Sequence, residues 1–295
     1  MNRIVAIIAC LVLVACQPEP AAENAGAQAP SQEPVAETLA ALLDAQPDET
    51  KARYQFRHPK ETIEFFGIEP GMTVVEGLPG GGWYTRILLR WLGSEGRLIG
   101  ADYSLEMYPK FSWASEEFLA EQAKWKPNFV AWATEWGGEN GASVRAFNFG
   151  SMPAEFAGTV DVVFMVRAMH NLARFEADGG FLTAALGDAF AALKPGGTLG
   201  VVQHHARDEM PDAVADGSRG YLKKGFVIAA AERAGFEFVA ESDVNANPKD
   251  QPKEDDIVWR LPPTLGTSAE NPELRAEMEA VGESNRMTLK FRKPE

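Results

Sequence analysis

The side chains best suited to chemistry stand directly after short apolar runs, where the strands of a sheet would end. Glu76 closes the run 73–76 and opens a turn that contains Gly77, Gly80, Gly81 and Gly82. A turn without Cβ atoms lets backbone approach a ligand closely and aim its N–H groups at it. Asp102 follows twenty positions after Gly82, the offset at which nucleotide-binding βαβ units hold a ribose hydroxyl. The spacing predicts a nucleotide cradle, with a glycine-rich turn of an ordinary α/β domain as the alternative.

The glycine turn departs from two common phosphate-binding motifs. After Gly80 and Gly82, the third glycine position of the dinucleotide fingerprint holds Thr85, and no Gly-Lys-Ser/Thr sequence of a phosphate loop follows. A pyrophosphate ligand is therefore disfavoured. For the same reason, an oxidoreductase that uses a nicotinamide cofactor is the least favoured of the functions considered.

Three of the four histidines follow two further apolar runs. His170 comes after the run 160–166, and His204 and His205 come after the run 198–203. His170 is the first candidate for a general base, because the ordinary pKa of histidine suits proton transfer near neutrality. His204 or His205 could be its partner or could join it in binding a metal, but two histidines without a third ligand do not predict a metal site. The structural alternative is that these histidines bond to carbonyl groups at the rim of a sheet.

The elements that would position these residues alternate along the chain. Apolar runs predict strands over 73–76, 97–101, 143–149, 160–166, 198–203, 236–240 and 287–291. Helical spacing predicts helices over 48–67, interrupted near His58-Pro59, and over 83–92, 181–193, 225–234 and 272–281. Such alternation is typical of a doubly wound α/β sheet with helices on both faces, which binds ligands outside the carboxyl ends of its strands.

Two long segments interrupt the alternation. The insert 103–142 contains Trp125, Trp132 and Trp136, which share one helical face; core packing is favoured over an aromatic wall of a substrate pocket. The segment 245–285 contains five prolines and is long for a connection between two strands. If the sixth strand is parallel to the others, this segment leaves it at the ligand-binding rim. We therefore expect it to act as a lid.

Composition and the start of the chain bear on partners and location. A formal net charge of −14 with a pI near 4.9 argues against nucleic-acid binding. Arg3 followed by an apolar run to Ala15 predicts an export signal over 1–15, too short to span a bilayer. The residues before Cys16 resemble the lipobox of bacterial lipoproteins, which implies a lipidated Cys16 at the periplasmic face of a bacterial membrane. We expect a flexible tether over 16–33 and one domain over 34–295; a soluble secreted protein is the alternative.

Over residues 48 to 295 the pattern resembles class I S-adenosylmethionine-dependent methyltransferases. The resemblance is carried by the acid and glycine turn at 76–82, LKPGGTL at 193–199 and a closing pair of strands. Within that superfamily the chain is similar to a group of predicted exported methyltransferases. The shared sequences are PGMTVVEGLPGGGWYT at 70–85, HHARD at 204–208, NPKD at 247–250, LPPTL at 261–265 and NRMTLKFRKP at 285–294.

The resemblance implies a seven-stranded, mostly parallel sheet with a final antiparallel strand, and S-adenosylmethionine as cofactor. The turn from Gly77 to Gly82 would lie against the methionine part, and Asp102 would bind the ribose hydroxyls. Asn148, where many relatives have an acid, would approach the adenine. Glu76 would orient the turn or the cofactor's amino group.

Two functions follow from these observations. The first is an exported lipoprotein methyltransferase that acts on a small molecule or an envelope protein, aligning the reactants in a dry site. However, S-adenosylmethionine is made from ATP in the cytoplasm, and its charge prevents it from crossing a membrane unaided. The alternative is therefore a non-catalytic envelope lipoprotein that keeps the fold as a ligand-binding or partner-binding module.

Overall fold

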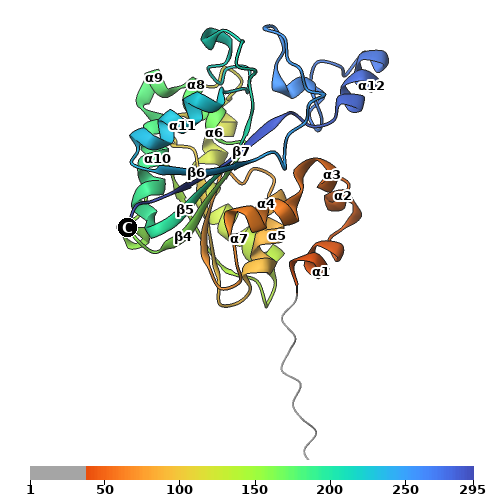
Figure 1. Cartoon of the computed structure of the whole chain (residues 1–295). Helices are drawn as coiled ribbons and strands as arrows, with labels where there is room; N and C mark the ends of the chain where they lie inside the picture. Colours follow the sequence, from red (N-terminus) through yellow and green to blue (C-terminus); the bar gives the residue numbers. More distant parts are fainter. Residues whose placement is uncertain (1–37) are drawn as a thin grey trace, which may run out of the picture. The chain divides into compact units, whose positions relative to one another are not determined.

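The computed structural model (Figure 1) describes residues 38 to 295, in which seven strands form one sheet with the order β3-β2-β1-β4-β5-β7-β6. Neighbours from β3 to β5 are parallel, whereas β7 runs antiparallel to both β5 and β6. The strands are β1 (Thr73–Gly77), β2 (Arg97–Asp102), β3 (Ser143–Asn148), β4 (Val160–Val166), β5 (Leu193–His204), β6 (Glu237–Ser242) and β7 (Arg286–Arg292). This confirms the predicted sheet, including its antiparallel strand. The predicted signal peptide, Cys16 and the tether lie outside the described residues.

Helices cover both faces of the sheet. On one face lie α1 (Leu39–Asp44), α4 (Pro59–Phe66), α5 (Trp83–Leu92) and α7 (Trp125–Gly137). On the other lie α8 (Met169–Arg174), α10 (Phe181–Ala192) and α11 (Lys224–Arg233). The remaining helices are α2 (Asp48–Lys51), α3 (Tyr54–Arg57), α6 (Glu116–Gln122), α9 (Glu176–Gly179) and α12 (Pro272–Val281).

The central strands are buried on both sides, which explains their continuous apolar sequences. Successive side chains of a strand point to opposite faces. Val74 therefore packs toward α4 and α5, and its neighbour Val75 packs toward α10. Two hydrophobic cores form in this way, one on each face, and together they fix the carboxyl ends of the strands.

The helices next to the glycine turn begin and end largely as predicted. Gly82 precedes α5 with a φ of 76°, and Gly93 ends it with a φ of 67°, conformations that glycine adopts without steric cost. The predicted helix over 48–67 is divided into α2, α3 and α4. His58 adopts a left-handed conformation with a φ of 38°, and Pro59 is the first residue of α4.

The fifth strand begins earlier than expected. Lys194-Pro195-Gly196-Gly197 was expected to separate a helix ending at Leu193 from a strand beginning at Thr198, but β5 already begins at Leu193. Leu193 pairs with Val160, and regular pairing resumes between Val162 and Thr198 after an irregularity. The Gly196 N–H donates to the Lys293 carbonyl, and the Lys293 N–H donates to Gly197. Hydrogen bonds with Lys293, which directly follows β7, thus keep this Pro-Gly-Gly segment in a strand conformation.

The tryptophans of the insert pack in two different ways. Trp125 stacks on buried Phe129, and the ring of Trp136 lies so close to Gly82 that a Cβ there would be 2.5 Å from it. Core packing is therefore confirmed for these two. The prediction is wrong for Trp132, which is 48% exposed.

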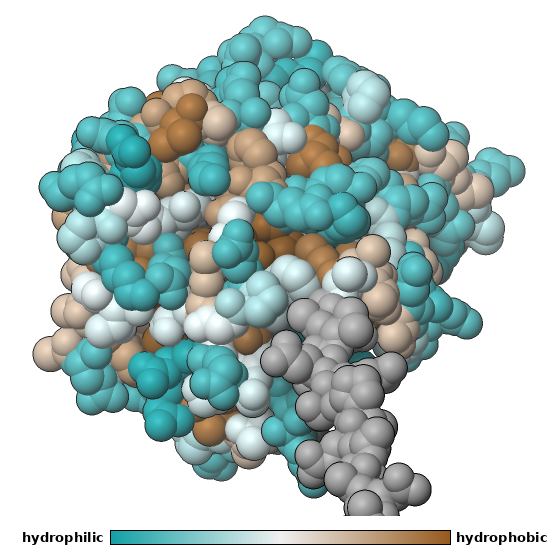
Figure 2. Space-filling model, turned by 60° about the horizontal axis from the view of Figure 1, so that its bottom comes forward, coloured by the Kyte–Doolittle hydropathy of each residue, from teal (hydrophilic) through white to brown (hydrophobic). Residues whose placement is uncertain are grey.

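No helix between residues 38 and 295 is long and apolar enough to cross a membrane. On the face shown in Figure 2, hydrophilic residues predominate and hydrophobic residues appear in small separate areas.

Candidate functional site

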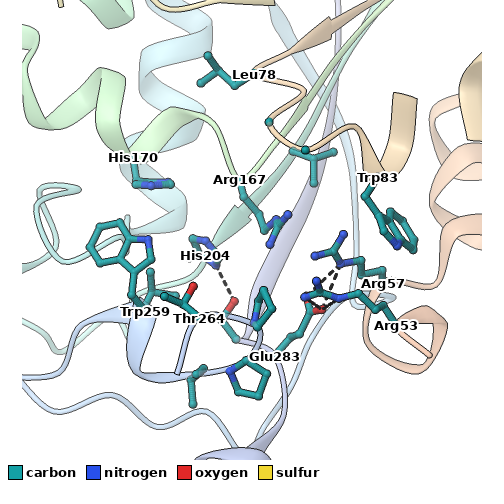
Figure 3. Close-up of a pocket in the computed structure, with 18 of the residues that line it drawn as sticks. Arg53, Arg57, Leu78, Trp83, Arg167, His170, His204, Trp259, Thr264 and Glu283 are labelled. Atoms are coloured by element: carbon teal, nitrogen blue, oxygen red, sulfur yellow. Dashed lines mark hydrogen bonds and ion pairs between the residues drawn. The ribbon is translucent and has the colours of Figure 1, made fainter. Parts of the chain in front are cut away.

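Two cavities lie at the carboxyl ends of the parallel strands. The first, about 440 Å³, is lined by residues that follow β1, β4 and β5, among them Arg167, His170 and His204 (Figure 3). We call it the arginine cavity. The second, about 410 Å³, is lined by Asn148 and the residues that follow β3 and β2, and we call it the β3 cavity. Asp102 ends β2, which stands between β1 and β3 in the sheet.

The glycines of the turn after β1 serve different purposes. Gly80 and Gly81 line the arginine cavity, and no atom lies within 4 Å of a Cβ built on Gly81. By contrast, a Cβ on Gly77 would lie 3.1 Å from Met165, and one on Gly82 would collide with Trp136. The first two glycines therefore leave space open for a ligand. The other two permit close packing within the protein.

Glu76 is buried at the end of β1 and faces α5. Its Oε2 accepts a hydrogen bond of 2.7 Å from the Thr85 hydroxyl in the first turn of that helix. Burial raises the pKa of Glu76 to about 7, although the hydrogen bonds from Thr85 lower it. Glu76 is not among the residues that line either cavity. Of the two implied roles, this geometry favours orienting the glycine turn.

Asp102 and Asn148 pair in register across β2 and β3, but their polar groups already have protein partners. The Asp102 carboxylate accepts hydrogen bonds from the Tyr103 N–H at 2.8 Å and the Tyr108 hydroxyl at 2.7 Å. The Asn148 amide donates to the Tyr103 carbonyl at 2.8 Å. Burial raises the pKa of Asp102 to about 6, despite these hydrogen bonds. Each carboxylate oxygen keeps a second lone pair, but Asp102 is buried and lines neither cavity.

His170 and His204 come together in the arginine cavity, with ring centroids 5.4 Å apart. The ring Nδ1 of His204 lies 2.6 Å from the Ser284 hydroxyl. Burial lowers the pKa of His170 to about 4 and holds that of His204 well below its ordinary value. The expected pKa near neutrality therefore does not hold for His170, because the ring is desolvated and lies near Arg167. Both rings are neutral at pH 7.

His205 does not join this pair. It follows His204 in the chain, so its side chain points to the opposite side of the strand, and it lines neither cavity. Within residues 38 to 295 no group of three or more His, Cys, Asp and Glu side chains is placed to hold a metal ion.

A group of arginines around Glu283 was not expected from the sequence. Arg53 and Arg57 approach Glu283 from the start of the domain (Figure 3), with Nε to Oε1 distances of 2.8 and 3.2 Å. Arg286, at the start of β7, donates to Glu283 Oε2 at 3.1 Å. Burial alone would raise the pKa of Glu283, but the surrounding arginines lower it below its ordinary value. One carboxylate is thus shared by three guanidinium groups.

Arg167 completes the group from the end of β4. Its backbone is left-handed, with a φ of 57°, and its N–H donates to the Val202 carbonyl at 2.6 Å. The side chain points into the cavity (Figure 3), and its buried Nε has no hydrogen-bond partner among the described residues. Burial, reinforced by the charge of Arg286, lowers the pKa of Arg167 to about 10. The group is still fully charged at pH 7.

The sequence contained a partial signal for these arginines. Arg53 and Arg57 are four positions apart in a predicted helix, and Arg167 directly follows a predicted strand. However, Glu283 is 226 residues from Arg57, and no local pattern connects the two.

The segment predicted as a lid contributes one wall of the arginine cavity. Val258, Trp259 and Leu261 line it, and the ring of Trp259 meets His170 edge-on at 5.8 Å. Arg260 anchors this segment through a 2.8 Å ion pair with Asp250. Asp250 also accepts a hydrogen bond from the Asn285 N–H at 2.9 Å, just before β7.

The chain is similar to several solved structures at low sequence identity. No protein-family model and no curated protein matches the chain. Among solved structures, a SAM-dependent methyltransferase from Aquifex aeolicus is 21% identical, with 68% of this chain and 93% of that chain covered at a TM-score of 0.45. A geranyl diphosphate methyltransferase in complex with SAM is 14% identical, with 86% and 90% covered at a TM-score of 0.48. An arsenic(III) S-adenosylmethionine methyltransferase from Chlamydomonas reinhardtii is 17% identical, with 87% and 73% covered at 0.45. These similarities are in the path of the backbone alone, and they assign no activity to this chain.

Proposed function

We propose that this protein is an S-adenosylmethionine-dependent methyltransferase that acts at the cell envelope. The observation that carries the proposal is the order of groups along one rim of the sheet. An open glycine turn, Asp102 and Asn148 end the adjacent strands β1, β2 and β3, and a cavity lies at either end of this row. Ligands of open α/β sheets bind at this rim.

The residues present fit the proposed cofactor. Gly80 and Gly81 would admit its methionine part beside the arginine cavity, because no side chain fills that space. Asp102 has free lone pairs for the ribose hydroxyls, and the β3 cavity beside Asn148 has room for the adenine. When bound, the cofactor supplies a methyl group activated by a sulfonium for in-line displacement.

The chain's own residues would position the acceptor and keep water out. Trp259 and its neighbours close one side of the cavity. A neutral His170 or His204 can hydrogen-bond to an attacking atom and orient it, but a pKa of about 4 makes His170 a weak general base. We therefore assign the two rings chiefly to alignment of the acceptor, which alone lowers a reaction barrier substantially.

The location at the envelope rests on the sequence before residue 38. The lipobox-like residues before Cys16 support lipidation of that cysteine and a membrane-tethered domain. We expect the full-length chain to incorporate labelled palmitate in a bacterial host and Cys16→Ser to abolish the label. Equal labelling of both chains would contradict this part of the proposal.

A second candidate, a non-catalytic module that binds a ligand or a partner, is favoured by one observation. The Tyr108 hydroxyl and Tyr103 backbone already occupy the Asp102 carboxylate, and Asn148 is bonded to Tyr103. These contacts stabilise the site without a cofactor. The module would then use the cavities for a different ligand.

Calorimetric titration of the full-length chain with S-adenosylmethionine separates the two candidates. We expect binding, and a loss of about 10- to 100-fold in Asp102→Asn, because hydrogen bonds to a charged group contribute about 1.5–3 kcal/mol. The matched control is Asp255→Asn, at an exposed position that lines neither cavity. Absence of binding at millimolar cofactor would favour the non-catalytic module.

A further inference from the structure

The arginine cavity carries an unbalanced charge. Arg53, Arg57 and Arg167 line it together with one carboxylate, Glu283. Arg286 does not line the cavity but contacts the same carboxylate as Arg53 and Arg57. His170 and His204 are neutral, so these residues leave three positive charges without a counter-charge. Among the described residues, Glu283 is the one carboxylate that lines the cavity.

This excess is not a consequence of composition, because the chain as a whole carries a net charge of −14. Arg57 and Arg286 are 3% and 2% exposed, so water screens them little. Burying a charge without a partner costs several kcal/mol. An acidic protein that gathers buried arginines at one cavity is therefore suited to receive an anion there.

The proposed cofactor does not supply that anion. S-adenosylmethionine carries a sulfonium, an ammonium and a carboxylate, and so adds a net positive charge. Even if one arginine binds the cofactor's carboxylate, the excess remains. We propose that the methyl acceptor is an organic oxyanion, a carboxylate or a phosphate ester, held in the arginine cavity with Arg167 as its main contact. This identity of the acceptor rests on the proposed methyltransferase function.

Arg167 is the best placed of the four for this contact. Arg53, Arg57 and Arg286 are committed to Glu283, whereas the buried Nε of Arg167 has no hydrogen-bond partner within the described part of the chain. Its planar fork matches the two oxygens of a carboxylate or phosphate. The backbone of Arg167 is left-handed, so the residue departs from the strand conformation of β4. Its side chain points toward the cavity (Figure 3).

The other residues that line the cavity indicate the chemistry of the uncharged part of the acceptor. Trp83, Trp259 and Pro262 line it together with Leu261, so an apolar group fits beside the charged end. A volume of about 440 Å³ is that of a small-molecule site. The wall formed by residues 258–264 further favours a small molecule over a folded protein.

Simple probes test the proposal. The full-length chain, saturated with S-adenosylhomocysteine to prevent turnover, is titrated at low salt with benzoate, phenyl phosphate and the neutral benzyl alcohol. We expect the anions to bind at least about tenfold more tightly than the alcohol, a difference of ~1.4 kcal/mol. The tighter of the two anions identifies the acceptor as a carboxylate or a phosphate ester.

Arginine substitutions test which side chains contact the bound anion. Arg167→Gln should weaken anion binding at least about tenfold, because it removes a charged hydrogen-bond donor. Arg53→Gln, at a half-exposed position whose partner Glu283 keeps Arg57 and Arg286, is the second variant and should also weaken it. Arg97→Gln removes the same charge from an exposed position at the start of β2 and should bind like wild type.

The proposal is overturned by equal binding of benzyl alcohol and the anions, by wild-type binding in both arginine variants, or by anion binding that is present without S-adenosylhomocysteine and lost in its presence. The last would assign the arginines to the cofactor's carboxylate. If S-adenosylhomocysteine does not bind but the anions still require Arg167, the methyltransferase proposal fails and the oxyanion site stands. If S-adenosylhomocysteine binds and the anions do not, the acceptor proposal alone fails.

Discussion

The two halves of the rim of the sheet differ in the sign of their buried charged groups. In the half formed by β1 and β2, the carboxyls of Glu76 and Asp102 are buried with neutral hydrogen-bond donors, and no cation among residues 38 to 295 pairs with them. In the half formed by β4, β5 and the start of β7, buried arginines outnumber their single carboxylate. One half holds anions that burial disfavours, and the other holds cations that lack counter-charges. We therefore expect the two halves to suit ligand groups of different charge.

The halves therefore respond to pH with opposite signs. Burial raises the pKa of Glu76 from 4.5 to about 7 and that of Asp102 from 3.8 to about 6, so their contribution to stability is present in acid and is lost as pH rises through these values. The pKa of His170 falls from 6.5 to about 4, and that of Glu283 is also lowered. Their contribution is present above the ordinary values and is lost as pH falls through the lowered ones.

The largest expected effect comes from removing the one carboxylate of the arginine half. Glu283→Gln should lower the free energy of unfolding by about 3–5 kcal/mol at pH 7, because buried arginines lose their shared counter-charge. Urea unfolding measures the loss. The matched control is Glu279→Gln, whose exposed pair with Arg275 contributes at most about 1 kcal/mol. A similar small loss in both variants would mean that the arginines do not depend on Glu283.

The next effect tests the carboxylate half. Between pH 4.5 and 8 we expect Glu76 to cost wild type on the order of 3 kcal/mol, since a pKa raised to about 7 opposes ionisation of a buried group. Glu76→Gln should lack this part of the pH dependence. Unfolding free energies measured across this range in both chains provide the test, with exposed Glu69→Gln as control. Equal slopes in wild type and Glu76→Gln would contradict the prediction.

A smaller effect separates packing from ligand space within the glycine turn. Gly82→Ala should destabilise the fold by at least about 1–2 kcal/mol, because its φ is 76° and its Cβ would collide with Trp136. Gly81→Ala should unfold like wild type but bind S-adenosylmethionine about tenfold more weakly (~1.4 kcal/mol), since its methyl enters the cavity. Urea midpoints and calorimetry measure the pair. Equal stability of the two variants would show that the glycines do not differ in role.

The smallest effect concerns a residue outside both halves. Trp132→Gln should change stability by no more than about 0.5 kcal/mol and leave ligand binding intact, because Trp132 is exposed and lines neither cavity. Trp136→Gln, in contrast, removes the ring against Gly82 and should cost more. Thermal unfolding and calorimetry compare them. Weakened binding in Trp132→Gln would restore the aromatic wall as an interpretation of the insert.

The same contrast explains how much could be predicted from the sequence. The carboxylate half lies within one stretch from Thr73 to Asp102, where strand, turn and helix signals are contiguous, so its elements and their order were predicted. The arginine half joins segments near residues 53, 167, 204, 259 and 283. Its members share no local period, and only the folded sheet brings them together.

Other differences have the same physical origin. A pKa depends on burial, which the identity of His170 does not reveal, so its shift to about 4 could not be predicted. Helical spacing placed Trp132 on one face with Trp125 and Trp136, but it does not tell how far the covering elements extend over that face. The early start of β5 depends on hydrogen bonds to Lys293, almost a hundred residues away.

The position of β7 in the sheet also determines when the arginine cavity can form during folding. Arg286 begins β7 and Glu283 and Ser284 directly precede it, and this strand lies between β5 and β6. Until that strand has been synthesised and has paired, Arg53 and Arg57 have no counter-charge and two strand edges remain open. A chain without β7 would thus lose both its charge balance and the strand that joins β5 to β6, so the cavity is complete only when this strand is in place.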